Sequence, residues 1–217
     1  MATVNQITRR TQSVAETYNH IAHDFSNTRT KYNIWHSVRK FIEGLSAESL
    51  VADIGCGNGK NMQLRRDELE YIGMDISDEM VTICQTRGFN VVQGDILQIP
   101  FDDEYVDACM SIAVIHHLTT RAERISAIRE LIRITKAGGK IIIYVWAFEQ
   151  PESSKRKFTS HDEMVPFINK DGTTHYRYYH LYTDGELLGE VMEACPDLTI
   201  IESLTEMGNY VIVAETV

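Results

Sequence analysis

The sequence predicts an α/β fold in which a doubly wound, mostly parallel sheet ends in an antiparallel pair of C-terminal strands. Between residues 50 and 146, short apolar runs alternate with amphipathic stretches, the pattern that parallel strands and their covering helices produce. Two further apolar runs near the C-terminus are joined only by residues 205–209. This connection is too short for a parallel crossover, so these two strands must pair antiparallel.

The individual elements are assigned from hydrophobic periodicity. Helices are expected at residues 14–25, 32–44, 121–135 and 184–194. Strands are expected at residues 50–54, 71–75, 90–92, 106–111, 140–146, 198–204 and 210–217. In the third helix Ile125, Ile128, Leu131 and Ile132 share one face, and Asp184 is placed to cap the fourth.

The length of 217 residues predicts one compact domain over residues 1–217, with residues 1–45 as an N-terminal helical extension that contributes to the active site. The longest uncharged apolar run, residues 141–148, is too short to span a membrane, and the polar N-terminus has no signal-peptide core. We therefore expect a soluble protein in the cytoplasm, or also in the nucleus. The four cysteines are scattered without metal-ligand spacing, so reduced thiols and no metal site are expected.

The formal net charge of −10 has the wrong sign for a protein that binds nucleic acid over its whole surface. An RNA substrate would therefore need a local basic patch or a second protein. Small basic clusters occur at residues 155–157, at residues 9–10 and at Lys31. The ordinary interpretation of such clusters is solvated surface.

A glycine-rich turn follows the first predicted strand. Gly55, Gly57 and Gly59 have the spacing GxGxG, with Asp53 two residues before the first glycine. This differs from the GxGxxG of dinucleotide-binding folds, which place a pyrophosphate at a helix N-terminus. S-adenosylmethionine has no phosphate and carries an ammonium and a sulfonium, which an acid such as Asp53 can favour. The turn therefore predicts a site for this cofactor.

Further candidates for the cofactor site follow the next strands. Asp75 ends the second strand and is placed to accept hydrogen bonds from both ribose hydroxyls. Asp95, after the third strand, would reach the adenine amino group, with Ile96 against the ring; Ser111 ends the fourth strand. Each acid alone could equally cap a helix or turn. Their joint placement after successive strands favours a binding site.

These features, with residues 131–140 and the apolar strand that follows, resemble the class I S-adenosylmethionine-dependent methyltransferases, whose fold is Rossmann-like. Three segments, residues 18–29, 111–117 and 175–182, closely resemble a narrower family: the eukaryotic tRNA methyltransferases that esterify 5-carboxymethyluridine at the wobble position. The most specific parts are residues 145–150, 165–167 and 178–187. This resemblance implies methyl transfer from S-adenosylmethionine to the carboxylate of the modified uridine in the tRNA anticodon loop.

The implied substrate needs no general base, because a carboxylic acid with a pKa near ~4 is already ionised at neutral pH. With the resemblance, Arg29 and Arg177 are the candidates to hold this carboxylate, and His116 to orient it or to pack against the base. Trp146 and Tyr179, with Tyr178, are candidates to stack on an unstacked base. Structural ion pairs, a satisfied histidine pair and core packing are the alternative interpretations.

The resemblance also implies a heterodimer with a small zinc-binding activator protein. The expected contact is the edge strand near Phe89 to Val92, since an uncovered edge invites strand addition. Several relatives carry a long basic insertion where this chain has only residues 168–174. If that insertion serves tRNA binding, this chain must bind tRNA by other means, for which residues 155–157, residues 9–10 and Lys31 are the candidates. Two other functions remain open: a methyltransferase for a small carboxylate or phenol, and a cofactor-binding scaffold without catalysis.

Overall fold

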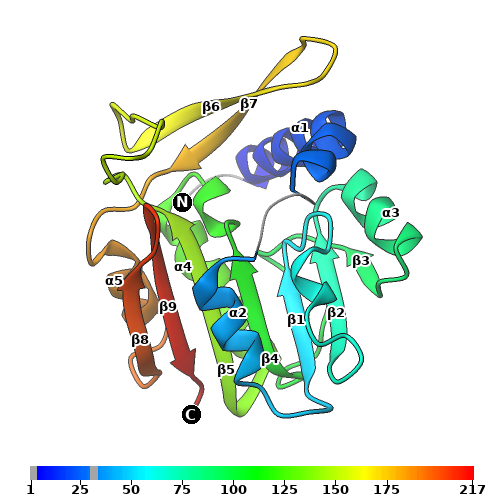
Figure 1. The fold of residues 1–217 in the computed structure, drawn as a ribbon. Coiled ribbons are helices and arrows are strands. Elements are labelled where there is room, and N and C mark those ends of the chain that lie inside the picture. Colours follow the sequence, from blue (N-terminus) through cyan, green and yellow to red (C-terminus); the bar gives the residue numbers. More distant parts are fainter. Residues whose placement is uncertain (1–3, 30–33) are drawn as a thin grey trace.

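The computed structural model describes residues 4–29 and 34–217, with side chains from residue 14 onward. A seven-stranded sheet has the order β3-β2-β1-β4-β5-β9-β8 (Figure 1). Its strands are β1 Leu50–Ile54, β2 Glu70–Asp75, β3 Val91–Gln93, β4 Val106–Ile112, β5 Thr135–Trp146, β8 Thr199–Thr205 and β9 Asn209–Glu215. β1 to β5 pair in parallel, whereas β9 is antiparallel to both β5 and β8. The predicted fold class is confirmed, and β3 is an edge strand as predicted.

Helices cover both faces of this sheet (Figure 1). The helix α2 (His36–Glu43) packs its apolar side on one face, and α4 (Arg121–Ile134) and α5 (Glu186–Ala194) cover the other. The helix α3 (Asp78–Thr86) lies at the β3 edge and begins at Ser77, whose hydroxyl accepts a hydrogen bond from the Met80 amide. Thr120 and Glu123 form a reciprocal capping box that starts α4.

Most predicted boundaries lie within one or two residues of the observed ones, with four differences. One is that α2 begins at His36, later than the predicted start at residue 32. The first helix, α1 (Val4–Arg29), is longer than predicted, and β5 begins at Thr135 because this residue pairs with Val106 of β4. The predicted cap at Asp184 is wrong: α5 starts after Gly185, which has a φ of 75°. The Glu186 carboxylate instead accepts hydrogen bonds from the Thr183 amide and hydroxyl. Residues 32–33, Lys31 and the side chains of residues 9–10 lie outside the described part of the chain.

A hairpin of two strands, β6 (Asp162–Ile168) and β7 (Thr174–His180), forms a separate sheet that was not predicted. Its alternation is hard to recognise because both faces carry polar residues and Pro166 interrupts β6. The hairpin and α1 both lie above the carboxyl ends of the parallel strands (Figure 1). Ring contacts join them: His20 stacks on His175 and Phe25 packs against Phe167.

No helix in the described ranges has the length and apolar character needed to cross a membrane.

A buried ion pair joins α4 and α5, the two helices on the far face of the sheet. The Arg124 guanidinium donates to the Glu190 carboxylate at 2.7 Å, and the Glu190 side chain has no exposed surface. The Tyr182 hydroxyl donates a further hydrogen bond to Glu190. These contacts fix the packing of α4 against α5, and the position of the hairpin depends on this packing.

We predict that Arg124→Ala lowers the free energy of unfolding by about 3–5 kcal/mol, because it leaves the Glu190 charge buried without its partner. Urea denaturation followed by circular dichroism measures this. The matched control is Arg129→Ala on the same helix, which is exposed and contacts only carbonyl oxygens at 3.4 Å; a change below about 1 kcal/mol is expected there. Equal losses for the two variants would contradict the prediction.

Candidate active site

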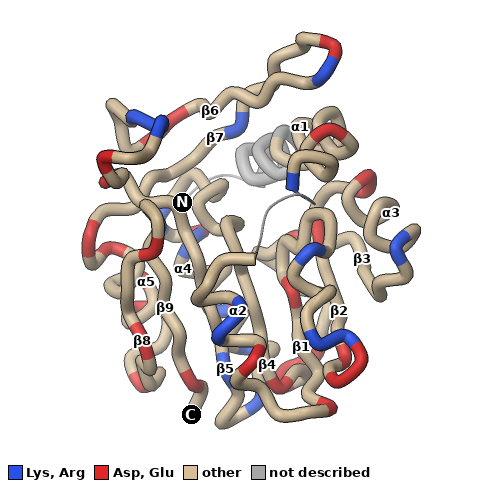
Figure 2. Tube along the Cα trace, in the orientation of Figure 1, with Lys and Arg blue, Asp and Glu red and all other residues tan. Residues whose placement is uncertain are grey.

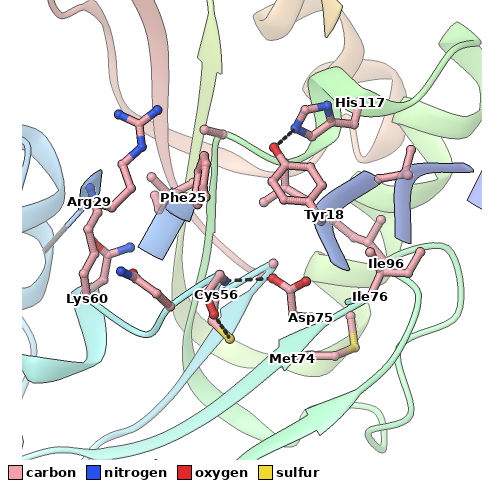
Figure 3. A pocket seen from close by; sticks show the side chains of 18 of the residues that line it. Tyr18, Phe25, Arg29, Cys56, Lys60, Met74, Asp75, Ile76, Ile96 and His117 are labelled. Atoms are coloured by element: carbon pink, nitrogen blue, oxygen red, sulfur yellow. Dashed lines mark hydrogen bonds between the residues drawn. The ribbon is translucent and has the colours of Figure 1, made fainter. Parts of the chain in front are cut away.

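A cavity opens at the carboxyl ends of β1, β2 and β4, beneath α1 (Figure 3). Its floor is the glycine turn, and one wall comes from the residues that end β2 and follow β3. Tyr18, Phe25 and Arg29 of α1 cover the opposite side, and His117 approaches from the turn after β4 (Figure 3). Residues far apart in the sequence therefore form one enclosure.

The glycine turn requires its glycines for conformation and for space. Gly55, Gly57 and Gly59 have φ values of 77°, 54° and 73°, a region that other residues rarely adopt. A Cβ atom at Gly55 would lie 2.3 Å from a Val114 methyl group. Gly55 and Gly57 line the cavity, whereas Gly59 is packed away from it against Phe89 and Cys84. Two of the three predicted glycines thus face a ligand, and the third serves the packing of the turn.

Asp75 connects the glycine turn to β2. Its carboxylate accepts hydrogen bonds from the Gly57 amide at 2.8 Å and the Ser77 amide at 3.0 Å, and it lines the cavity (Figure 3). Burial raises the pKa of Asp75, and the backbone hydrogen bonds oppose this rise by favouring the charged form. The carboxylate is therefore held in a fixed position facing the cavity, as a ribose diol requires.

Asp53 lies next to the glycine turn but does not line the cavity. Its side chain is almost fully buried, and neither carboxylate oxygen has a hydrogen bond of normal length within the described ranges. Burial raises the pKa of Asp53 to about 7; the nearby Asn61 side chain offsets this only in part. A buried acid without a partner beside the turn fits a bound cation, which is what S-adenosylmethionine supplies.

The remaining predicted cofactor residues divide into two groups. Asp95 and Ile96 line the cavity wall after β3, and an Asp95 oxygen accepts a hydrogen bond from the Leu97 amide. Ser111 is fully buried at the end of β4, away from the cavity, and its hydroxyl has no partner within the described ranges. The set of acids at the ends of β1, β2 and β3, of which Asp53 and Asp75 are buried, fits the cations and hydroxyls of the predicted cofactor.

The histidine pair is placed differently from the sequence prediction. His117 lines the cavity, while His116 is fully buried and stacks on Tyr179 at 4.5 Å between ring centroids. The two residues belong to η2 (Ile115–His117), a short 3-10 helix, in which consecutive side chains point about 120° apart. Only one of them can therefore face the cavity.

His117 is held neutral by its surroundings. Its Nδ1 lies 2.8 Å from the Tyr178 carbonyl oxygen and its Nε2 lies 2.8 Å from the Tyr18 hydroxyl. Since a carbonyl oxygen only accepts, Nδ1 carries the proton and Nε2 accepts from Tyr18. Burial lowers the pKa of His117 to about 4. This histidine therefore orients Tyr18 against the cavity and carries no charge at neutral pH.

Trp146 and Tyr179 line the cavity as predicted candidates, with ring centroids 4.5 Å apart. Arg29 also lines it, over the Phe25 ring. Arg177 is buried beside this cavity, in the wall of a smaller one that shares Tyr18 and His117. Its guanidinium donates to the Tyr179 hydroxyl at 2.9 Å and to the Pro166 carbonyl, and its Nε atom has no partner among the described residues.

Sequence reasoning missed several lining residues, among them Tyr18, Phe25, Lys60, His117 and Arg156. Lys60 directly follows the glycine turn, so its position was a usable signal; its ammonium lies over the Trp35 ring. Arg156 belongs to the basic cluster at residues 155–157, but the sequence did not place it at this cavity, because it comes from the loop between β5 and β6. Within the described ranges, no three His, Cys, Asp or Glu side chains are grouped as a metal ion would require.

Comparison with known proteins identifies the family. A family model described as a methyltransferase domain matches residues 52–143. The tRNA (carboxymethyluridine(34)-5-O)-methyltransferase of Schizosaccharomyces pombe is 33% identical, covering 97% of this chain and 99% of that relative. The tRNA (carboxymethyluridine(34)-5-O)-methyltransferase alkbh8 of Xenopus tropicalis is 34% identical over 93% of this chain, but the chain spans only 40% of that relative.

A similar fold occurs in a solved complex between the Haloferax volcanii Trm112 methyltransferase activator and a methyltransferase. The matched chain of that complex has a TM-score of 0.69 and 17% identity, and the match covers 94% of this chain and 97% of that chain. With the acids at the strand ends, the methyltransferase domain identifies S-adenosylmethionine as the cofactor. The chain belongs to the tRNA (carboxymethyluridine(34)-5-O)-methyltransferase family.

Proposed function

We propose that this chain transfers the methyl group of S-adenosylmethionine to the carboxylate of 5-carboxymethyluridine at the wobble position of tRNA, which gives the methyl ester. The observation that carries the proposal is Arg177. It is 6% exposed and has no carboxylate partner within the described ranges. A buried guanidinium without a counter-charge is costly unless a ligand supplies the anion. The relatives' names supply the matching substrate, carboxymethyluridine(34).

Apart from Lys60, which follows the glycine turn, the charges around the cavity are separated by type. The acids Asp53, Asp75 and Asp95 belong to the cofactor side, at the carboxyl ends of β1, β2 and β3. Arg29 and Arg177 come from α1 and the hairpin, on the opposite side. Such a division suits a reaction between a cationic methyl donor and an anionic acceptor. The acids face the cationic donor, and the arginines face the anionic acceptor.

The reaction requires orientation of the acceptor carboxylate more than it requires proton transfer. The bound cofactor supplies an electrophilic methyl group on a sulfonium. The acceptor carboxylate is already ionised, so no base is needed, and neutral His117 has both ring nitrogens engaged. Arg177 can hold one carboxylate oxygen and leave the other free to attack. Trp146 and Tyr179 offer aromatic surface against which the uracil ring can pack.

A small zinc-binding activator is the proposed partner, in a heterodimer through β3. β3 is a three-residue strand at the edge of the sheet, and it pairs with β2 on its inner side; on its outer side the Val91 carbonyl accepts a hydrogen bond from the Gln85 side chain. The Haloferax complex supports this proposal, since its methyltransferase assembles with the Trm112 activator. Strand addition at this edge would leave the cavity at the strand ends open.

The decisive experiment is methyl transfer from labelled cofactor to tRNA, with and without the activator, followed by mass spectrometry of the nucleosides. We expect the methyl ester of 5-carboxymethyluridine and no incorporation into tRNA that lacks the carboxymethyl group. A methylated base of another kind, or methylation of a free small acid or phenol in preference to tRNA, would refute the proposal. Cofactor binding without any transfer would instead point to a scaffold.

Arg177→Ala should lower kcat/KM for the modified tRNA roughly 10- to 150-fold, the value of a hydrogen bond to a charged group of about 1.5–3 kcal/mol. The dissociation constant of S-adenosylmethionine, measured by calorimetry, should stay unchanged. Arg39→Ala is the control, because this half-buried arginine pairs with Glu43 on α2. An equal loss of cofactor binding in Arg177→Ala would mean that the residue serves only the fold.

Cofactor affinity should rise with pH through the range set by Asp53. Its pKa is about 7 without a ligand, and a nearby ammonium or sulfonium favours the ionised form, so binding releases a proton. Affinity at pH 6 should therefore be about tenfold weaker than at pH 8. Calorimetry at both pH values tests this, with Asp53→Asn as the variant that should lose the pH dependence. The same slope in both proteins would contradict the assignment.

A further inference from the structure

Arg156 lies at the mouth of the cavity on the loop between β5 and β6. Its guanidinium carbon lies 3.8 Å from the centre of the Trp146 ring, and both residues line the cavity. In Figure 2 this loop is the basic segment at the end of the hairpin nearest β8. A guanidinium that is stacked on indole keeps its N–H groups free at the edge, where they can donate to an anion.

This arginine has no carboxylate partner within the described ranges, whereas three arginines elsewhere in the chain do. Arg39, Arg121 and Arg133 each pair with a glutamate. The acids that follow Arg156 in sequence are engaged elsewhere: Glu163 accepts from the Thr159 and Ser160 amides, and Asp162 accepts from Tyr178. No salt bridge or hydrogen bond of the Arg156 side chain occurs within the described ranges; its contact is the indole.

Two other guanidinium groups act on Arg156 through space. Burial, together with the charges of Arg29 and Arg177, lowers the pKa of Arg156, and the Tyr179 hydroxyl opposes this. Arg29 and Arg156 at the cavity, with Arg177 beside it, thus lack a carboxylate partner within the described ranges, in a chain whose net charge is −10. This is the local basic patch that an acidic protein needs for an anionic ligand.

Depth separates the roles of these cations. Arg177 is 6% exposed, so it faces the part of an acceptor that leaves water. Arg156 is exposed at the rim, so it faces the part that stays hydrated. In a nucleotide acceptor the reacting carboxylate must enter the cavity, whereas the phosphodiester remains at its mouth.

We propose that Arg156, held flat on the Trp146 ring, binds a phosphodiester next to the wobble uridine and positions the acceptor nucleotide over the cavity. The inference rests on the proposed function, because it takes a modified tRNA as the acceptor. Arg156 is a positioning residue: it acts on the backbone of the RNA and leaves the carboxylate to the buried cations.

The test compares two acceptors that share the carboxylate but differ in phosphate: tRNA that carries 5-carboxymethyluridine, and the free nucleoside 5-carboxymethyluridine. Initial rates of methyl transfer are measured for the wild-type chain, Arg156→Ala and Arg156→Lys. Lys140→Ala is the control, since Lys140 lies at the start of the parallel part of β5, at the other end of the strands. The salt dependence of KM for the tRNA is measured for each.

Arg156→Ala should raise KM for the tRNA about tenfold with kcat nearly unchanged, and Arg156→Lys should fall between it and the wild type. The slope of log KM against log salt should decrease by about 0.7–0.9, the value of one phosphate contact. Transfer to the nucleoside should be the same as in the wild type. Lys140→Ala should change none of these quantities.

Three results would overturn the inference. An unchanged KM and salt slope would mean that Arg156 does not contact the RNA. An equal loss on the nucleoside would mean that Arg156 contacts the carboxylate. A lower kcat with unchanged KM would mean that it acts on the chemical step. A wild-type chain without transfer to the modified tRNA would instead refute the proposed function, so the two failures are distinguishable.

Discussion

The hydrogen bond between the Gly57 amide and the Asp75 carboxylate is the contact on which the cofactor side of this site depends. It ties the turn after β1 to the end of β2, and a second tie runs from the Gly55 and Cys56 amides to the Met74 carbonyl. Because the strands are parallel, their carboxyl ends meet at one edge of the sheet. The turn therefore cannot move without the acid that faces the ligand, and the cavity floor is rigid before any ligand binds.

The roof of the cavity depends on contacts of a different kind. α1 is fastened to this floor by polar side chains: Asn58 donates to the Ser26 carbonyl, and the Ser77 hydroxyl bonds Asn19. The hairpin is fastened by His180, which lies between the Asp162 and Glu186 carboxylates. Two elements that belong to neither face of the main sheet thus complete the site. The sheet and its turns form the cofactor side of the site, and α1 and the hairpin form the acceptor side.

The electrostatics of the site differ from those of the rest of the molecule. Elsewhere Asp and Glu residues are distributed along the whole trace together with Lys and Arg residues (Figure 2), and several of these form ion pairs. In and beside the cavity, Arg29, Arg156 and Arg177 lack carboxylate partners in the described part of the chain. Net charge therefore governs the long-range field, whereas a few buried or stacked guanidinium groups set the preference for an anion at short range.

The sequence by itself determined the fold class, the parallel strands and the glycine turn, because these depend on local hydrophobic period and backbone conformation. It also located Asp75 and Asp95, since an acid at a strand end needs no distant partner to reach a ligand there. Only the tertiary structure decided that His117 faces the cavity in place of His116, that Gly59 and Ser111 lie away from it, and that Arg156 covers Trp146. These outcomes depend on the direction of side chains that are packed by α1 and the hairpin, and long-range packing leaves no periodic signal in the chain.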